Sequence, residues 1–271
     1  MSLVFGCIAP HPPVLLPEIG RGRERDVFAT SRALNDAALR FGRTCSRTVF
    51  IVTPHGPAYH EAMGVYSAPA SSGNMDMWGV GGISFQFEND AEAVELLMEE
   101  AEAAAIPMRP WPAGYDLDHG VLVPIYFLQV GMPGAALVPL TFSWLPLNRH
   151  FDFGKALGRV CARLQRPCAI IASGDMSHRL LPGAPNGYHP SGKIFDRALA
   201  EAVGKLDAQA LLAMDPGLVE EAGECGLRSV MILLGALEGL QVRPEVLSYE
   251  GPFGVGYLVA TFEVEAPGKS A

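Results

Sequence analysis

Short apolar runs rich in valine and isoleucine alternate along this chain with longer stretches in which apolar residues recur every three or four positions. We predict strands at 3–9, 47–53, 134–142, 168–174 and 254–265. We predict helices at 24–42, 90–105, 153–165, 192–206 and 227–239. This alternation is typical of an α/β fold with a mixed, largely parallel sheet.

No linker rich in serine, proline or charge divides the 271 residues, so we expect one domain over residues 1–265 and a disordered tail at 266–271. The segments 63–67 and 83–87 are expected to form a hairpin that is added to the sheet. The glycine-rich stretch 71–82 between them lacks the spacing and the lysine of a phosphate-binding loop. We therefore predict a flexible loop there.

The net charge of −9 argues against a nucleic-acid partner, because phosphate binding requires clustered lysine and arginine. No apolar run approaches the ~20 residues of a membrane span, and the first residues lack the basic leader of a signal peptide. The five cysteines form no C-x-x-C pair, which favours reduced thiols over a disulfide framework or a zinc knuckle. Together these features predict a cytoplasmic protein with no membrane association.

Three of the seven histidines follow predicted inner strands: His11 in IAPHPP, His55 in VTPHGP and His178 in SGDMSH. Ligands of open α/β sheets bind outside the carboxyl ends of the strands, so these histidines can meet in space. The proline before His11 and before His55 restricts the direction in which each loop leaves its strand. One such histidine is more often a turn residue, but three after separate strands favour a shared metal or catalytic site.

Two imidazoles need a further ligand, and a carboxylate is the usual partner where iron(II) keeps positions open for substrate and dioxygen. Glu224 is the candidate, because Gly223 and Gly226 interrupt the helical pattern around it. Alternatively, Glu224 is a structural acid at the N-terminus of a helix, where the helix dipole favours a negative charge. Glu220 and Glu221 compete for the assignment, but as a pair they are typical of a solvated surface.

Three more residues are candidates for the walls of this site. His119, at the start of an apolar segment, is interpreted as a pocket wall or as an N-terminal turn residue. Asp175 is interpreted as orienting His178 through a hydrogen bond, or as a loop or helix cap. Cys225 is either a buried small apolar residue or a thiolate close to a metal. Candidates to line an aromatic pocket, where they are not packed in the core, are Tyr59, Trp78, Trp144 and Tyr188.

Five motifs occur in this order along the chain: APHPP, TPHG, DHGVLVP, SGDMSH and AGECGLRS. Together they resemble the LigB family, the catalytic subunits of class III extradiol ring-cleavage dioxygenases, and within it the branch that is linked to AMMECR1 and related to the Memo proteins. The resemblance covers residues 3 to about 262. It implies a single three-layer αβα domain and assembly as a dimer or larger oligomer.

The resemblance also implies a function, the iron(II)-dependent opening of a catechol-like or aminophenol-like ring by dioxygen. The iron would be held by His11, His55 and Glu224. His178 and His119 would be catalytic, with His178 as the acid/base and His119 lining the substrate pocket. The same pocket would include Asp175 and Cys225. An AMMECR1-type protein or a second subunit is a candidate partner.

Two other functions stay open on the sequence. In the Memo relatives a cysteine at the position of Cys225 stands among the metal-site residues, so this chain is alternatively a metal-binding or interaction protein without ring cleavage. A zinc hydrolase that uses His11, His55 and Asp175 is the third alternative, weakened because no water-activating carboxylate has an evident place. The distance between Glu224 and the two histidines distinguishes the dioxygenase from the hydrolase.

Overall fold

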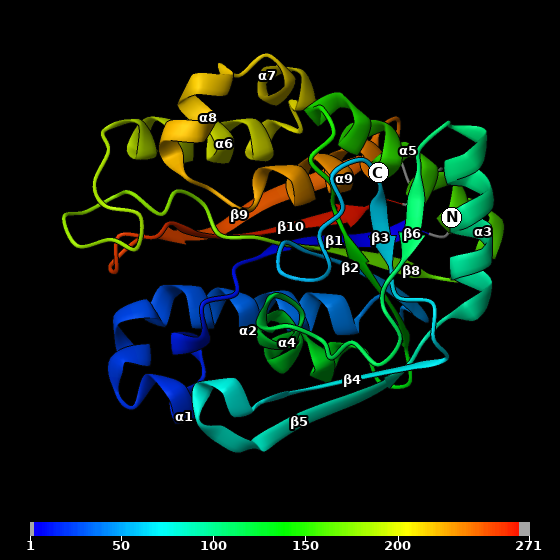
Figure 1. The fold of residues 1–271 in the computed structure, drawn as a ribbon, viewed down its shortest axis with the longest axis horizontal. Helices are drawn as coiled ribbons and strands as arrows, with labels where there is room; N and C mark the ends of the chain where they lie inside the picture. Colours follow the sequence, from blue (N-terminus) through cyan, green and yellow to red (C-terminus); the bar gives the residue numbers. More distant parts are fainter. Residues whose placement is uncertain (1–2, 266–271) are drawn as a thin grey trace.

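Eight strands form one mixed sheet at the centre of the computed structural model, which describes residues 3–265 (Figure 1). In order across the sheet they are β6 (Met108–Pro110), β3 (Met63–Val65), β7 (Ala136–Thr141), β2 (Thr48–Thr53), β8 (Cys168–Ser173), β1 (Leu3–Ala9), β10 (Tyr257–Val264) and β9 (Val242–Glu250). The four inner strands β7, β2, β8 and β1 run parallel, and β3 and β10 flank them antiparallel. The predicted mixed, largely parallel sheet is confirmed.

Side chains alternate across this sheet and fill two separate cores. Val49 and Ile51 of β2 pack into the core on one face, and Phe50 and Val52 pack into the core on the other. Strands with both faces buried read as continuous apolar runs, which is why these segments were recognisable from the sequence.

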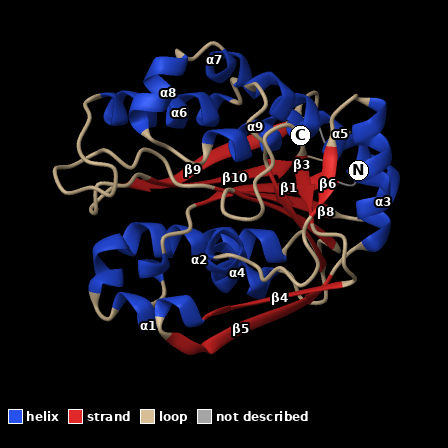
Figure 2. Ribbon diagram, in the orientation of Figure 1, coloured by secondary structure: helices blue, strands red, loops and turns tan. Residues whose placement is uncertain are grey.

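A layer of helices covers each face of the sheet (Figure 2). On one face lie α2 (Phe28–Gly42) and α4 (His119–Leu128), and on the other lie α3 (Ala91–Ala103), α5 (Leu147–Leu164), α6 (Ser191–Lys205) and α9 (Leu227–Leu237). Shorter helices are α1 (Pro17–Gly20), α7 (Ala208–Leu212) and α8 (Pro216–Ala222). The three-layer αβα arrangement is thus confirmed. Within residues 3–265, no helix has the length and apolar character to cross a membrane.

The predicted hairpin of 63–67 and 83–87 is wrong. Met63–Val65 is β3, which pairs with β7 and β6 in the main sheet, whereas 83–87 lies in β5 (Val80–Glu88). The partner of β5 is β4 (Ala70–Met75), so part of the predicted flexible loop is a strand of a separate two-stranded sheet. Small polar residues hid this strand from apolar patterning. Gly73 is needed there, because a side chain at this position would meet the Leu117 carbonyl oxygen at 2.6 Å.

Helices α5 and α9 approach so closely that glycine is required at their contact. A Cβ atom on Gly154 of α5 would collide with the carbonyl oxygen of Ile232 and lie 2.9 Å from the nitrogen of Ala236, both in α9. These are backbone atoms, which cannot move aside without shifting the whole helix. This contact sets the position of α9, and the functional site depends on α9 because Cys225 lies just before it.

We expect Gly154→Ala to lower the free energy of unfolding by about 1–3 kcal/mol, because it overpacks this contact. The matched control is Gly204→Ala in α6, where the nearest atom to a new Cβ would be Val246 Cγ2 at 3.8 Å. In that open position alanine should raise stability by roughly 0.5–1 kcal/mol, through helix propensity. Urea unfolding gives the free energy of unfolding of both variants. If both substitutions changed it equally and in the same direction, the close contact at Gly154 would be contradicted.

Candidate metal centre

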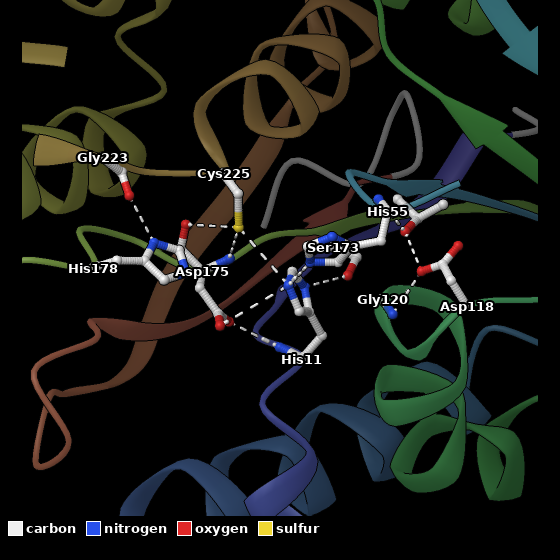
Figure 3. A network of polar contacts seen from close by, with 10 residues as sticks. His11, His55, Asp118, Gly120, Ser173, Asp175, His178, Gly223 and Cys225 are labelled. Carbon is white, nitrogen blue, oxygen red and sulfur yellow. Dashed lines mark hydrogen bonds and ion pairs between the residues drawn. The ribbon is translucent and has the colours of Figure 1, made fainter. Parts of the chain in front are cut away.

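The loops that follow three neighbouring parallel strands converge at one edge of the sheet (Figure 3). His11 follows β1, His55 follows β2, and Asp175 follows β8, which lies between β1 and β2. Because parallel strands point their carboxyl ends in the same direction, their loops must share this edge. The expectation that His11 and His55 meet in space is confirmed by the distance between their rings.

Three ligand atoms gather at this edge. His11 Nε2 lies 3.0 Å from His55 Nε2 and 3.8 Å from Cys225 Sγ, and all three ligand atoms lie within 4.8 Å of one another. His11 is buried, whereas His55 is exposed, so the cluster is open to solvent on the side of His55. Nitrogen and sulfur donors on one side of an open space are the arrangement of a metal site that retains free coordination positions.

The separations agree with a single shared ion. Bonds of about 2.1 Å to nitrogen and 2.3 Å to sulfur, at angles of about 90–110°, place two nitrogens about 3.0–3.4 Å apart and a nitrogen about 3.1–3.6 Å from a sulfur. The observed 3.0 Å and 3.8 Å lie within a few tenths of an ångström of these ranges. His11 is therefore placed to share a metal ion with His55 and with Cys225, and the ligand atoms of His55 and Cys225 lie within 4.8 Å of each other.

Residues around His11 determine the direction of its ring. Its Nδ1 contacts Ser173 Oγ at 3.0 Å, which turns Nε2 toward the cluster. Its backbone N–H donates to Asp175 Oδ1 at 2.9 Å, and Asp175 Oδ2 lies 3.9 Å from Nε2. Such partners beyond the ligands commonly fix the orientation of a metal-binding imidazole.

Desolvation keeps the cluster uncharged in the absence of metal. It lowers the pKa of His11 well below its ordinary value, with further lowering by His55 and His178, and it also lowers the pKa of His55. Burial raises the pKa of the Cys225 thiol. Neutral imidazoles are ready to bind, but the thiol must lose its proton, so metal binding through Cys225 is expected to release one proton.

Glu224, the predicted third ligand, is not among the three residues whose ligand atoms gather here. Glu224 Oε2 accepts a hydrogen bond from the backbone N–H of Leu227 at 2.6 Å, and its Oε1 lies 3.9 Å from Arg228 Nη1. The carboxylate thus caps the first turn of α9, which was the alternative interpretation. The next residue, Cys225, turns its thiol the other way, into the cluster.

His119 forms one wall of the site. Its ring stacks on His55 with 4.3 Å between centroids and meets Trp78 edge-on at 5.5 Å. Trp78 comes from the short helical turn Asp76–Trp78 between β4 and β5, so the two-stranded sheet reaches this wall. Burial lowers the pKa of His119 to about 3, which keeps it neutral at physiological pH. The interpretation of His119 as a pocket wall agrees with this position.

His178 is oriented by a different group from the one expected. Its Nδ1 lies 2.7 Å from the carbonyl oxygen of Gly223, so Nδ1 carries a proton and donates it. That carbonyl is available because Gly223 ends α8 in the left-handed conformation, with φ 61°. Asp175 instead binds the backbone of His11, and burial raises the pKa of its carboxyl group to about 6. The hydrogen bond predicted from Asp175 to His178 is replaced by the one to Gly223.

A family model described as the catalytic LigB subunit of aromatic ring-opening dioxygenase matches residues 6–260. This chain belongs to the LigB family. Protein CA_C1420 of Clostridium acetobutylicum is 33% identical over 97% of this LigB chain, which spans 58% of that protein. The chain therefore covers less than two thirds of the length of this curated relative.

A solved structure shares the fold of this LigB protein. The uncharacterized protein JW3007 from Escherichia coli K12 superposes with a TM-score of 0.66 at 15% identity, covering 96% of this chain and 99% of that one. At this identity the likeness concerns the fold alone. The family resemblance predicted from the five motifs is confirmed.

Two residues that support the site of this LigB protein escaped the sequence analysis. Ser173 ends β8 as a polar residue after an apolar run, a signal that the side chain faces a functional edge. Asp118 Oδ1 accepts hydrogen bonds from Thr53 Oγ1 and from the N–H of Gly120, both at 2.7 Å, and so ties the start of α4 to the end of β2. The helix-capping pattern of an aspartate before His119 was the available signal.

We expect Cys225→Ser to lower the metal content of this LigB protein, because it removes the thiolate ligand. Glu224→Gln should retain metal, because its side chain caps α9. Both variants change one group in the same segment, so each controls for the other. Metal analysis after reconstitution with iron(II) or zinc(II) measures the number of metal ions bound per chain in each variant. Loss of metal in Glu224→Gln together with full retention in Cys225→Ser would reverse the assignment.

Asp196 on α6 supports the segment that carries Asp175 and His178. Its carboxylate accepts hydrogen bonds from the backbone N–H of Ser177 at 2.8 Å and from Tyr249 Oη at 2.6 Å. Asp196 is only 1% exposed. Burial raises its pKa from 3.8 to about 7, and the two hydrogen bonds oppose that shift.

A raised carboxyl pKa means that the folded protein keeps a proton which the unfolded chain releases. The free energy of unfolding should therefore fall as the pH rises from about 4 to 7, by roughly 1 kcal/mol per pH unit from Asp196. Asp196→Asn removes this contribution, and its amide oxygen still accepts from Ser177. Urea unfolding at several pH values tests this, and parallel pH profiles of the two proteins would contradict it.

Proposed function

We propose that this LigB protein is an iron(II)-dependent extradiol dioxygenase whose metal is held by His11, His55 and Cys225. The observation that carries the proposal is the convergence of these three ligand atoms within 4.8 Å of one another. The family assignment to aromatic ring-opening dioxygenases supports the class of reaction. The proposed ligands are a catechol-like or aminophenol-like aromatic compound and dioxygen.

Cys225 replaces the carboxylate of the usual two-histidine, one-carboxylate arrangement. A thiolate carries the same single negative charge as a carboxylate, so the total charge of the three protein ligands is unchanged. Bound iron(II) would supply Lewis acidity and redox chemistry for the reaction of an aromatic diol with dioxygen. The protein's own contribution is to orient the ring and to move its protons.

His178 is suited to proton transfer. Because Nδ1 donates to the Gly223 carbonyl oxygen, Nε2 of the neutral ring is unprotonated and can accept a proton. We infer that it takes a proton from a ring hydroxyl and returns it during ring opening. The hydrogen bond to Gly223 persists through both steps and keeps the imidazole in one tautomer.

The wall made by His119 and Trp78 is suited to an aromatic substrate. Both rings are neutral and present faces or edges that pack against an aromatic ring. Trp78 is 39% exposed, so part of its ring is accessible. We propose that this wall positions the substrate beside the cluster.

A second candidate follows from the thiol of Cys225. Soft thiolate ligands favour copper(I) and zinc(II), whereas carboxylates favour harder ions. A two-histidine, one-cysteine site therefore also suits a metal-binding protein without ring cleavage, the alternative that the resemblance to the Memo proteins implied. The choice between the two candidates depends on turnover.

We expect the iron(II)-loaded protein to consume dioxygen with catechols or aminophenols and to form a yellow ring-opened product. His178→Ala should keep its metal and lose turnover by about 10²-fold or more, because it removes the proton acceptor. The matched control is His60→Ala, which changes an exposed histidine of the loop that carries His55. An oxygen electrode and metal analysis on the same samples give both readouts.

Full turnover in His178→Ala would remove that residue from the mechanism. One metal ion bound per chain, with no oxygen uptake for any of the catechols and aminophenols tested, would reject the dioxygenase and favour the second candidate. His11→Ala or His55→Ala should lose metal while remaining folded, and full iron content in both would reject the site itself.

A further inference from the structure

A cavity of about 830 Å³ lies beside the segment that leads into α9, and none of the metal-cluster residues lines it. Its walls come from residues 144–148 after β7, from 212–220 in and around α7 and α8, and from the first turn of α9. This volume lies within the range of about 300–1,000 Å³ that small-molecule sites occupy. The cavity is therefore large enough for a ligand of its own.

The cavity walls are mostly aliphatic. Leu147, Leu212, Met214, Val219 and Leu227 all contribute to them. Such a surface favours a ligand with an apolar body, because covering it removes apolar area from water. Apolar burial alone would not select one ligand over another.

Arg228 provides the selective group. Its guanidinium stacks on Trp144 at 4.9 Å and on Phe142 at 5.8 Å, which holds it in place. Within residues 3–265 no hydrogen bond from this guanidinium is formed, and its Nε is enclosed without a partner. The carboxylate of Glu224 lies 3.9 Å from Nη1, beyond hydrogen-bond distance. Arg228 and Glu224 thus form an ion pair without a hydrogen bond, and within residues 3–265 the guanidinium donors at the cavity wall have no acceptor.

The acids at the cavity limit the charge of a ligand. Glu224 is almost fully enclosed, with its side chain 3% exposed, and one of its oxygens is already bound by Leu227. Glu220 also lines the cavity, from an exposed position. Two acids beside one arginine disfavour a dianion, whereas a single carboxylate can pair with Arg228.

We propose that this cavity is a second ligand site that binds an amphipathic monocarboxylic acid. The carboxylate of the ligand pairs with Arg228, and its aliphatic body lies among the leucines of α5, α7 and α9. The site borders the metal cluster without sharing its ligands, because Glu224 lines the cavity and Cys225 faces the cluster. An occupant here contacts the same segment that holds His178 through Gly223.

The test uses the purified full chain and isothermal titration calorimetry, with octanoate as the probe and octan-1-ol as its uncharged counterpart. We expect one octanoate per chain and binding of octan-1-ol weaker by about tenfold or more, as a charge-assisted hydrogen bond requires. Arg228→Met should lower the affinity for octanoate to that for octan-1-ol. The control Arg32→Met, at an exposed position in α2, should leave binding unchanged.

A second variant protects the test against a folding defect in Arg228→Met. Leu212→Trp keeps the guanidinium and fills the cavity, so it should also abolish octanoate binding. Equal affinity for octanoate and octan-1-ol, or no heat of binding at millimolar octanoate, would overturn the proposal. The proposal would also be overturned if the protein sedimented as a dimer whose interface covers this cavity and whose dissociation constant octanoate does not change. The occupant of the cavity would then be a second copy of the chain.

Discussion

The lateral pairing of β1, β8 and β2 is the constraint on which the rest of the site depends. These three strands are adjacent and parallel, so the loops after them leave the sheet at the same edge. His11, Asp175 and His55 come from these loops, although 164 residues separate His11 from Asp175. A change in strand order or direction would separate the two imidazoles, whatever their local sequence.

Burial then determines the chemical state of what the strands bring together. Desolvation disfavours every charged form at the cluster, so it lowers the pKa of the imidazoles and raises the pKa of Cys225 and Asp175. At neutral pH the two imidazoles and the thiol are thereby kept uncharged, whereas Asp175, with a pKa of about 6, is still largely ionised. A metal cation can therefore bind to the nitrogen lone pairs of neutral imidazoles without repulsion from imidazolium charge. Binding to Cys225 releases one proton from its thiol.

The segment between α8 and α9 serves two sides of the molecule. Gly223 ends α8 and offers its carbonyl oxygen to His178, Glu224 caps α9 beside the aliphatic cavity, and Cys225 joins the metal cluster. In the proposed site this segment supplies a thiolate where a carboxylate is the usual ligand. The close packing of α9 on α5 through Gly154 and Gly235 holds the segment in register with the strand ends.

The α/β architecture, the family and the position of His11 and His55 at one edge of the sheet could all be predicted from the sequence. Two local signals allowed this. A fully buried strand is a continuous apolar run, and a histidine directly after such a run lies at the edge of the sheet. The sequence could not show that Cys225 lies beside the histidines while Glu224 caps α9, because packing determines where neighbouring side chains of an irregular segment point. Only the tertiary structure decided that Trp78 meets His119 and that Arg228 borders a cavity. These contacts join elements far apart in the chain, and no periodicity in the sequence encodes them.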